Sequence, residues 1–130
     1  MQIHQSAEDY LETILMLSQR MGKVRSIDVV NELGFTKASV SIAMKKLREN
    51  GYIAVDGEGN LTLLEPGLEI AQRIYSRHQL LTHFFVQLGV DEQTAAEDAC
   101  KAEHILSEQT LEKIRARAIE TDAELAKPAE

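Results

Sequence analysis

Two short amphipathic segments separated by Gly34 constrain the fold of this chain more than any other feature. The first begins at Ser26, which can cap a helix, and carries three apolar residues at helical spacing: Ile27, Val30 and Leu33. Gly34 can adopt the left-handed conformation that ends a helix, and Thr36 can cap a second helix from about Lys37 to Asn50. Two helices joined by a short glycine-containing turn predict a helix-turn-helix.

Two β-like runs follow this pair of helices. They are Ile53–Val55 and Leu61–Leu64, and the loop Asp56–Asn60 between them contains two glycines. Short apolar runs on either side of a glycine-bearing loop are typical of a β-hairpin. A helix-turn-helix followed by a hairpin predicts a winged helix.

The rest of the chain shows helical periodicity. We expect a first helix from Ser6 to about Arg20, and a long helix from Pro66 to about Leu88 with one apolar stripe: Ala71, Ile74, His78, Leu81, Phe85 and Leu88. Asp91 can cap the next helix and Ser107 a last one, built on Leu111, Ile114 and Ala118, and we expect the tail to fray after about Thr121. The prediction is a mainly α fold with a small β-hairpin wing, divided into a winged helix over residues 1–65 and a helical domain over residues 66–130.

Length and composition limit the class of protein. The chain has 130 residues, 44% of them hydrophobic, which is enough for a folded core. No apolar run approaches the roughly 18 residues of a membrane span, and the start lacks the pattern of a secretory signal. One cysteine cannot form an intramolecular disulfide, which fits a reducing compartment. We therefore expect a cytoplasmic protein that does not enter a membrane.

Charge is distributed unevenly along the chain. The net charge is -7, of which residues 1–62 carry -1 and residues 63–130 carry -6. Residues 37–48 contain four basic and no acidic side chains, which predicts a local basic face. A solvated surface is the ordinary explanation of such a face, but a purely solvated helix rarely exposes an isoleucine such as Ile42.

The outward residues of the second short helix fit duplex DNA. Small side chains at its start allow close approach to base edges, Ala38 or Ile42 can contact a thymine methyl, and lysines can reach phosphates. The hairpin tip fits less well, because Asp56 and Glu58 would oppose phosphates. The predicted DNA-binding residues are Arg25, Thr36, Lys37, Ala38, Ser39, Ser41, Ile42, Lys45 and Lys46.

A second functional pattern is the spacing of Cys100, Glu103 and His104. On a helix these three side chains fall within an arc of about 100° and offer a thiolate, a carboxylate and an imidazole to a transition metal. One helix cannot complete a coordination shell. Further donors occur one turn apart near the start of the chain, Asp9 and Glu12, and on the stripe of the long helix, His78.

Each donor alone has an ordinary explanation. A lone cysteine is usually buried, a histidine on an apolar stripe is usually a core residue, and acidic residues on a helix flank are usually solvated. Six donors on three predicted helices favour a joint metal site instead, whereas His4 and His83 lack such companions and are taken as structural or surface residues.

At these residues the chain resembles the diphtheria-toxin-repressor family of metal-dependent transcriptional repressors, especially the short manganese transport regulator branch. The resemblance covers nearly the whole chain and is carried by four segments: Ser6–Glu12, Thr36–Tyr52, Arg77–Leu81 and Cys100–His104. It implies a homodimer, a helical dimerisation and metal-binding domain after the winged helix, and repression of metal-uptake genes.

The resemblance also implies a ligand set. Asp9, Glu12, His78, Glu103 and His104 match ligand positions of the manganese branch, whereas Cys100 stands where that branch has glutamate. Cysteine there is similar to the iron-dependent branch, but that branch usually has methionine at position 9 and a glutamate of an ancillary site at position 82, where this chain has threonine. The expected cofactor is Mn(II) or Fe(II), one or two ions per subunit, with Zn(II) able to bind in vitro.

Our working hypothesis is a metal switch. Without metal the carboxylates repel one another; with metal the first helix is tied to the other ligand-bearing helices, which sets two recognition helices about 34 Å apart for a palindromic operator. The main alternative is a metal-independent winged-helix regulator that responds to a small ligand. A small metalloenzyme is disfavoured, because the sequence offers no nucleophile or oxyanion element.

Overall fold

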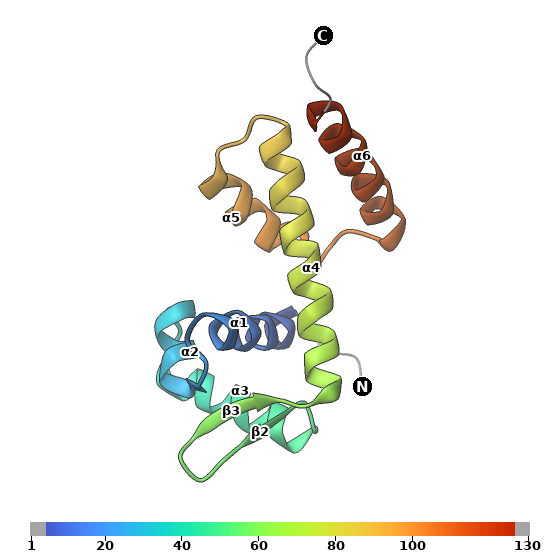
Figure 1. Cartoon of the computed structure of the whole chain (residues 1–130). Helices are drawn as coiled ribbons and strands as arrows, with labels where there is room; N and C mark the ends of the chain where they lie inside the picture. The colour runs from blue at the N-terminus through green and yellow to red at the C-terminus, as the bar shows by residue number, and fades with distance from the viewer. Residues whose placement is uncertain (1–4, 127–130) are drawn as a thin grey trace. The chain divides into compact units, whose positions relative to one another are not determined.

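The computed structural model describes residues 5–126 (Figure 1). In chain order the elements are α1 (Gln5–Met21), β1 (Val24–Arg25), α2 (Ser26–Leu33), α3 (Lys37–Glu49), β2 (Ile53–Val55), β3 (Asn60–Leu63), α4 (Glu65–Gln87), α5 (Glu92–Ala102) and α6 (Glu108–Ala126). They form two compact units, Met1–Tyr75 and Ser76–Glu130, and α4 contributes residues to both. The mainly α fold with a small β-sheet agrees with the prediction.

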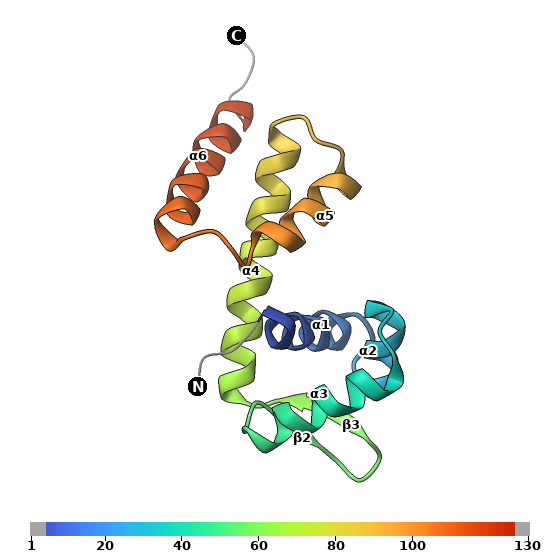
Figure 2. The same cartoon turned by 180° about the vertical axis from the view of Figure 1, so that it is seen from behind.

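The first unit is a winged helix. Helices α1, α2 and α3 pack with a small antiparallel sheet, in which Figures 1 and 2 show β2 beside β3. The sheet has three strands in the order β1-β3-β2. In the hairpin Ile53 pairs with Leu63, and Val55 pairs with Leu61. The third strand, β1, was not predicted from the sequence. It has only two residues and lies directly before a helix, which is too short a segment to show an alternating pattern.

Apolar residues at helical spacing build the core of this unit. Leu11, Ile14 and Val40 are almost completely buried, and Val24 and Ile53 join them from the sheet. The buried residues of α3 are Val40, Met44 and Leu47, which fall on one face of the helix. The opposite face of α3 therefore remains at the surface.

The turn between α2 and α3 forms as its residues predict, with one correction. Gly34 ends α2 with φ 71°, and Thr36 caps α3 by accepting a hydrogen bond from the Ser39 N–H at 3.1 Å. Ser26, however, is not the cap of α2. Because β1 runs straight into the helix, Ser26 is its first residue, and the Asp28 carboxylate accepts the Arg25 N–H at 2.9 Å.

The second unit consists of the C-terminal part of α4 with α5 and α6. Its core is centred on Leu81, Ala99 and Leu111, with Phe85 and Ile114 packed against them. Two predictions are corrected here. Helix α4 ends at Gln87, so Leu88 lies outside the stripe and is 67% exposed, and α6 continues past Thr121 to Ala126.

Interhelical polar contacts account for the length of α6. Nε2 of His83 lies 2.9 Å from an Asp122 carboxylate oxygen, and the Gln87 side chain donates to the same carboxylate and to the Ala118 carbonyl. These contacts anchor the last turns of α6, which carry too few apolar residues for a helix to be predicted there from an apolar stripe.

Within residues 5–126, no helix combines the length and apolar character that crossing a bilayer requires.

Candidate functional site

The outer face of α3 presents seven of the nine residues predicted to contact DNA, whereas Thr36 is the N-cap of this helix and Arg25 lies on β1. All nine predicted residues are exposed, and Ile42 is 58% exposed although it is a large apolar side chain. Thr36 fixes the start of the helix, and Lys46 and Arg48 lie in its last turn, where cations are favoured by the helix dipole. The face is therefore basic at one end and lined with small side chains at the other.

The hairpin is held in shape by Asp56 and Arg25. One Asp56 carboxylate oxygen accepts the backbone N–H groups of Glu58 and Asn60, each at 2.9 Å, and the other accepts the Asn60 side-chain amide at 2.9 Å. These bonds, first of all the one from the Asn60 side chain, lower the pKa of Asp56, so the tip stays negatively charged. Nε of Arg25 donates to the Glu58 carbonyl at 2.9 Å, which places this predicted DNA contact against the loop at the tip of the hairpin.

In the second unit, Glu103 lies between two imidazoles. Its carboxylate is completely buried, with Oε2 at 3.1 Å from Nδ1 of His78 and Oε1 at 3.4 Å from Nε2 of His104. The His104 side chain is only 2% exposed, and that of His78 is 20% exposed. The structure therefore brings together three of the six predicted ligands in this unit: His78 from α4, and Glu103 and His104 from the end of α5 and the turn that follows it.

The donors of this cluster fit a divalent transition metal. Oε1 of Glu103 is buried and accepts no hydrogen bond from the residues that the structure describes. A buried carboxylate oxygen without a donor is costly, and a cation satisfies it. One carboxylate and two imidazoles are a donor set that Mn(II), Fe(II) and Zn(II) accept.

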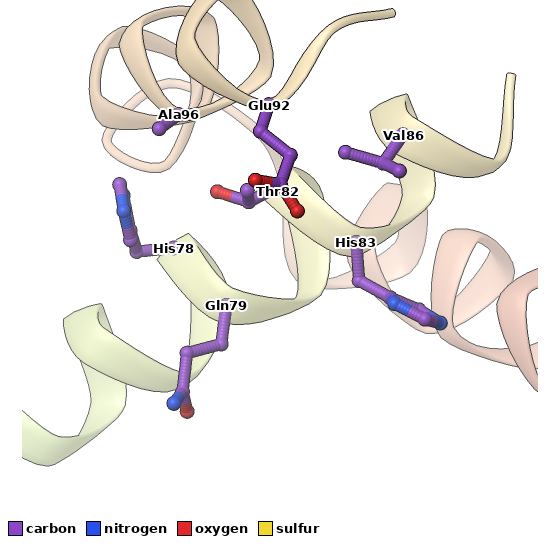
Figure 3. A pocket seen from close by; sticks show the side chains of 7 residues that line it. All are labelled: His78, Gln79, Thr82, His83, Val86, Glu92 and Ala96. Atoms are coloured by element: carbon purple, nitrogen blue, oxygen red, sulfur yellow. The ribbon is translucent and has the colours of Figure 1, made fainter. Parts of the chain in front are cut away.

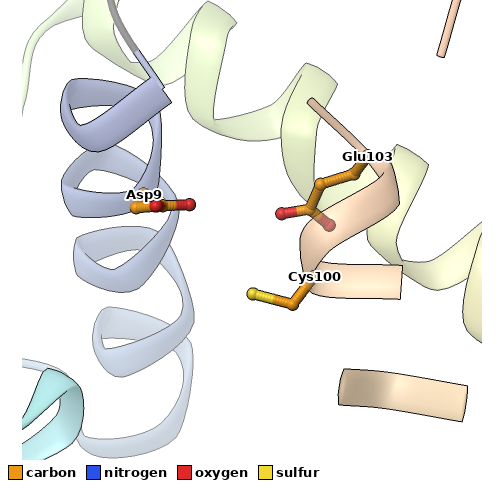
Figure 4. Close-up of side chains that lie close together, drawn as sticks. All are labelled: Asp9, Cys100 and Glu103. Carbon is orange, nitrogen blue, oxygen red and sulfur yellow. The ribbon is translucent and has the colours of Figure 1, made fainter. Parts of the chain in front are cut away.

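Cys100 adds a thiol on the same side of α5. Its Sγ and a Glu103 carboxylate oxygen lie within 4.8 Å of each other, and Figure 4 shows both side chains projecting from this end of the helix. Cys100 is exposed, which rules out the ordinary explanation that it is a buried apolar residue. Cys100 thus presents an exposed thiol beside this carboxylate.

Glu103 and His104 are not on the regular helix that their spacing predicts. Helix α5 ends at Ala102, Glu103 keeps helical torsion angles as its C-cap, and His104 lies in the following turn. The chain turns here because Leu106 packs into the core of the second unit and Ser107 caps α6 by accepting the Thr110 N–H at 3.2 Å.

Asp9 and Glu12, the other two predicted ligands, lie on α1 in the first unit, where Figure 4 shows Asp9 projecting from the helix. Glu12 is 5% exposed, so it is not the solvated flank residue that its position alone indicates. Burial, and secondly the Asp9 charge, raise the pKa of the neighbouring Tyr10. The carboxylate of Asp9 therefore contributes to the electrostatic field at this part of α1.

His78 also borders a pocket of about 460 Å³ between α4 and α5 (Figure 3). The pocket is lined by His78, Gln79, Thr82, His83, Val86, Glu92 and Ala96. The Thr82 hydroxyl is buried and has no hydrogen-bond partner among the described residues. A neutral hydroxyl is a weaker metal ligand than a carboxylate. Thr82 is therefore a poorer ligand than a glutamate at the same position would be.

One charged residue next to the cluster was missed from the sequence. Arg77 donates to the backbone carbonyl of Glu103 at 3.2 Å and forms an ion pair with Glu108 in the first turn of α6. No residue-type pattern singles it out, because arginine is not a metal ligand and its partner is a main-chain atom.

Two domain profiles of known proteins match consecutive parts of the chain. The sequence profile of the iron dependent repressor N-terminal DNA binding domain matches residues 2–61, and that of the iron dependent repressor metal binding and dimerisation domain matches residues 64–120. An HTH-type transcriptional regulator of Methanocaldococcus jannaschii is 37% identical over 113 residues, covering 85% of this chain and 90% of that protein. The HTH-type transcriptional regulator MntR of Bacillus subtilis is 34% identical, covering 84% and 77%.

Solved structures give the same result. A manganese-dependent transcriptional repressor in complex with manganese matches with a TM-score of 0.78 and 28% identity, covering 86% of this chain and 52% of that one. The manganese regulator SloR matches with a TM-score of 0.72 and 26% identity, covering 88% and 53%. The chain thus spans about half the length of these two solved proteins.

The chain combines a winged helix with a cluster of metal donors, and it matches both domain profiles. Together these features define a class of metal-dependent DNA-binding regulators. Within that class, the chain belongs to the iron-dependent (diphtheria-toxin) repressor family, in the manganese transport regulator branch.

Proposed function

We propose that this protein is a transcriptional repressor that binds a palindromic DNA operator as a homodimer when loaded with a divalent metal ion, and so controls metal-uptake genes. The observation that carries the proposal is the buried Glu103 carboxylate between His78 and His104, in a chain that also exposes the α3 face. A metal-responsive repressor needs both parts.

We propose His78, Cys100, Glu103 and His104 as ligands from the second unit, and Asp9 and Glu12 as ligands from the first. The support for the last two is their one-turn spacing in the sequence and their match to the manganese-branch pattern. When bound, the ion supplies positive charge that offsets the carboxylates and the thiolate. Ligands drawn from both units would couple metal occupancy to the arrangement of the DNA-reading helix.

The donor types support Mn(II) or Fe(II) as the ion, with one or two ions per subunit. Carboxylates favour Mn(II), imidazoles suit Fe(II), and the thiol of Cys100 favours softer ions, so Zn(II) is expected to bind in vitro. Because cysteine and histidine must lose protons to coordinate, we expect metal affinity to fall at low pH.

On the DNA side, we propose that α3 enters the major groove. Lys37, Lys45 and Lys46 then contact phosphates, while Ala38, Ser39 and Ile42 face base edges. The negatively charged hairpin tip is expected to stay away from phosphates.

A repressor acts where the chromosome is, which in a bacterium or archaeon is the cytoplasm. Repression by DNA binding requires no enzymatic activity.

The test begins with selection of a binding site from random duplex DNA with Mn(II)-loaded protein. Fluorescence anisotropy then measures the affinity for that site with Mn(II) and with a chelator. A coupling of about 1–3 kcal/mol between metal and DNA predicts that chelation weakens binding about 5- to 150-fold. Glu103→Gln should lose this response, and the matched control Glu108→Gln, at a 72% exposed side chain, should keep it.

Two results would contradict the proposal. Operator affinity unchanged by chelation would point to a regulator that ignores metals and responds to another ligand. A metal response retained in full by Glu103→Gln would mean that the buried carboxylate is not a ligand.

A further inference from the structure

The connection between α5 and α6 carries two of the proposed ligands and has little regular structure to hold it. Helix α5 ends at Ala102, and its last intrahelical donor is the Glu103 N–H, which reaches the Ala99 carbonyl at 2.9 Å. The next two bonds, from Ile105 and Leu106, both go to the Ala102 carbonyl, at 3.1 and 3.3 Å. Carbonyl groups at the end of a helix lack intrahelical partners. The Glu103 carbonyl is one of these groups.

Arg77 supplies the missing donor. Its Nη1 donates to the Glu103 carbonyl at 3.2 Å, a partly buried contact, and its Nη2 forms the ion pair with Glu108. A cation at the C-terminal end of a helix is also favoured by the helix dipole. One guanidinium therefore joins the end of α5 to the start of α6.

The two parts of this contact differ in strength. The Arg77 side chain is 16% exposed but its partner Glu108 is 72% exposed, and ion pairs to exposed carboxylates contribute little. The bond to the Glu103 carbonyl is partly buried and involves a charged donor, which makes it the stronger of the two.

Arg77 is adjacent to His78, and both residues hold Glu103. His78 contacts the Glu103 carboxylate at 3.1 Å, while Arg77 contacts the main-chain carbonyl of the same residue. The first contact orients the carboxylate, and the second fixes the backbone from which the carboxylate and the adjacent His104 extend.

We propose that Arg77 is a positioning residue for metal binding: its guanidinium holds the backbone at Glu103 so that the Glu103 and His104 donors converge. The inference rests on the proposed metal site. Partners that orient metal ligands without touching the metal typically change metal affinity 10- to 100-fold. Arg77 acts on a ligand backbone, so its loss should change the geometry of the bound ion as well as its affinity.

The experiment compares the wild-type protein with Arg77→Met, Arg77→Lys and Glu108→Gln. The matched control is Arg117→Met, which removes an equal charge from a side chain that is 65% exposed and forms an ion pair with Glu120. Calorimetry gives the Mn(II) affinity, visible absorption of the Co(II)-loaded protein reports ligand geometry, and thermal unfolding in chelator reports the stability of the metal-free protein.

We expect Arg77→Met to lower Mn(II) affinity about 10- to 100-fold and to shift the Co(II) absorption bands. Arg77→Lys should fall between Arg77→Met and the wild type, because an ammonium offers one compact donor in place of the fork. The Mn(II) affinity of Glu108→Gln should stay within about threefold of the wild-type value, and the affinity of Arg117→Met should equal the wild-type value.

The inference is overturned if the Mn(II) affinity of Arg77→Met is within about twofold of the wild-type value. It is also overturned if the loss of affinity is matched by a loss of stability of the metal-free protein while the Co(II) absorption bands stay unchanged. Should Arg77→Met fail to fold, the same criteria apply to Arg77→Lys. A wild-type protein that binds neither Mn(II) nor Co(II) would overturn the proposed function itself, whereas a normal wild type with unaffected Arg77 variants overturns only this inference.

Discussion

Gly67→Ala should strongly destabilise the winged-helix unit. Gly67 lies in the first turn of α4, and a Cβ built there overlaps the carbonyl oxygen of Tyr52, approaches its carbonyl carbon to 3.0 Å and approaches Cδ2 of Leu11 to 3.3 Å. The Leu11 side chain can rotate away. The Tyr52 carbonyl cannot move freely, because it accepts the Leu64 N–H at 3.0 Å and the Tyr52 N–H donates to Leu47 at 3.0 Å.

The magnitude follows from these opposing effects. Forcing a methyl group into a filled site typically costs about 1–3 kcal/mol, and a backbone neighbour held by hydrogen bonds places this site at or above the upper end. The better helix propensity of alanine returns at most about 1 kcal/mol. We expect a net loss of at least about 2 kcal/mol in the free energy of unfolding, which lowers Tm by roughly 5–10 °C for a chain of this size.

Thermal and urea unfolding followed by circular dichroism measure this loss. Gly57→Ala is the matched control, since a Cβ there meets nothing within 4 Å and Gly57 is not among the glycines with positive φ. The control should change stability by no more than about 0.5 kcal/mol. A Gly67→Ala protein as stable as the wild type would refute the close approach of α4 to Tyr52.

Three further predictions concern helix caps, pH and base contacts. Thr36→Ala removes the acceptor of the Ser39 N–H and should cost about 1 kcal/mol in chemical unfolding and weaken operator binding in anisotropy titrations; unchanged values for both would contradict the capping role. Hydrogen bonds from Thr94 lower the pKa of Asp91 below its ordinary 3.8, so its contribution to stability is complete above that value and is lost as pH falls through the lowered pKa. The Tm difference between wild type and Asp91→Asn should therefore be largest well above pH 3.8 and shrink as the pH falls below that value; a difference that grows with acid would show the opposite sign. If Ile42, which is 58% exposed, contacts a thymine methyl, replacing one operator thymine by deoxyuracil should weaken wild-type binding but not Ile42→Ala binding, and equal losses in both proteins would exclude the contact.

Most of the fold could be predicted because its elements have strong local determinants. Gly34, Thr36 and Asp91 each direct a turn or a cap by their own side-chain or backbone chemistry, and all three act as the sequence predicts. The errors occur where tertiary contacts decide. Strand β1 exists only because Val24 pairs with Leu61, a residue far along the chain.

The site was predictable to the extent that residue type defines chemistry. Histidine, cysteine and glutamate were identified as donors by type and spacing, and the structure brings His78, Glu103 and His104 together in one unit. The exact end of α5 was not predictable, because Cys100, Glu103 and His104 have the same spacing whether or not the helix continues. Whether Asp9 and Glu12 complete the shell stays a prediction.

Arg77 shows why a search by ligand type finds only part of such a site. The chemical type of a donor atom is set by its side chain, but its direction depends on the backbone. At Glu103 the backbone is held by Arg77, whose guanidinium cannot bind a cation. Because Arg77 and His78 are consecutive on α4, any change that rotates this part of the helix moves the backbone contact and a proposed ligand together. Metal affinity and the order of the connection should therefore change together in variants of α4, and ligand substitutions at Cys100 should lower affinity without loosening the connection.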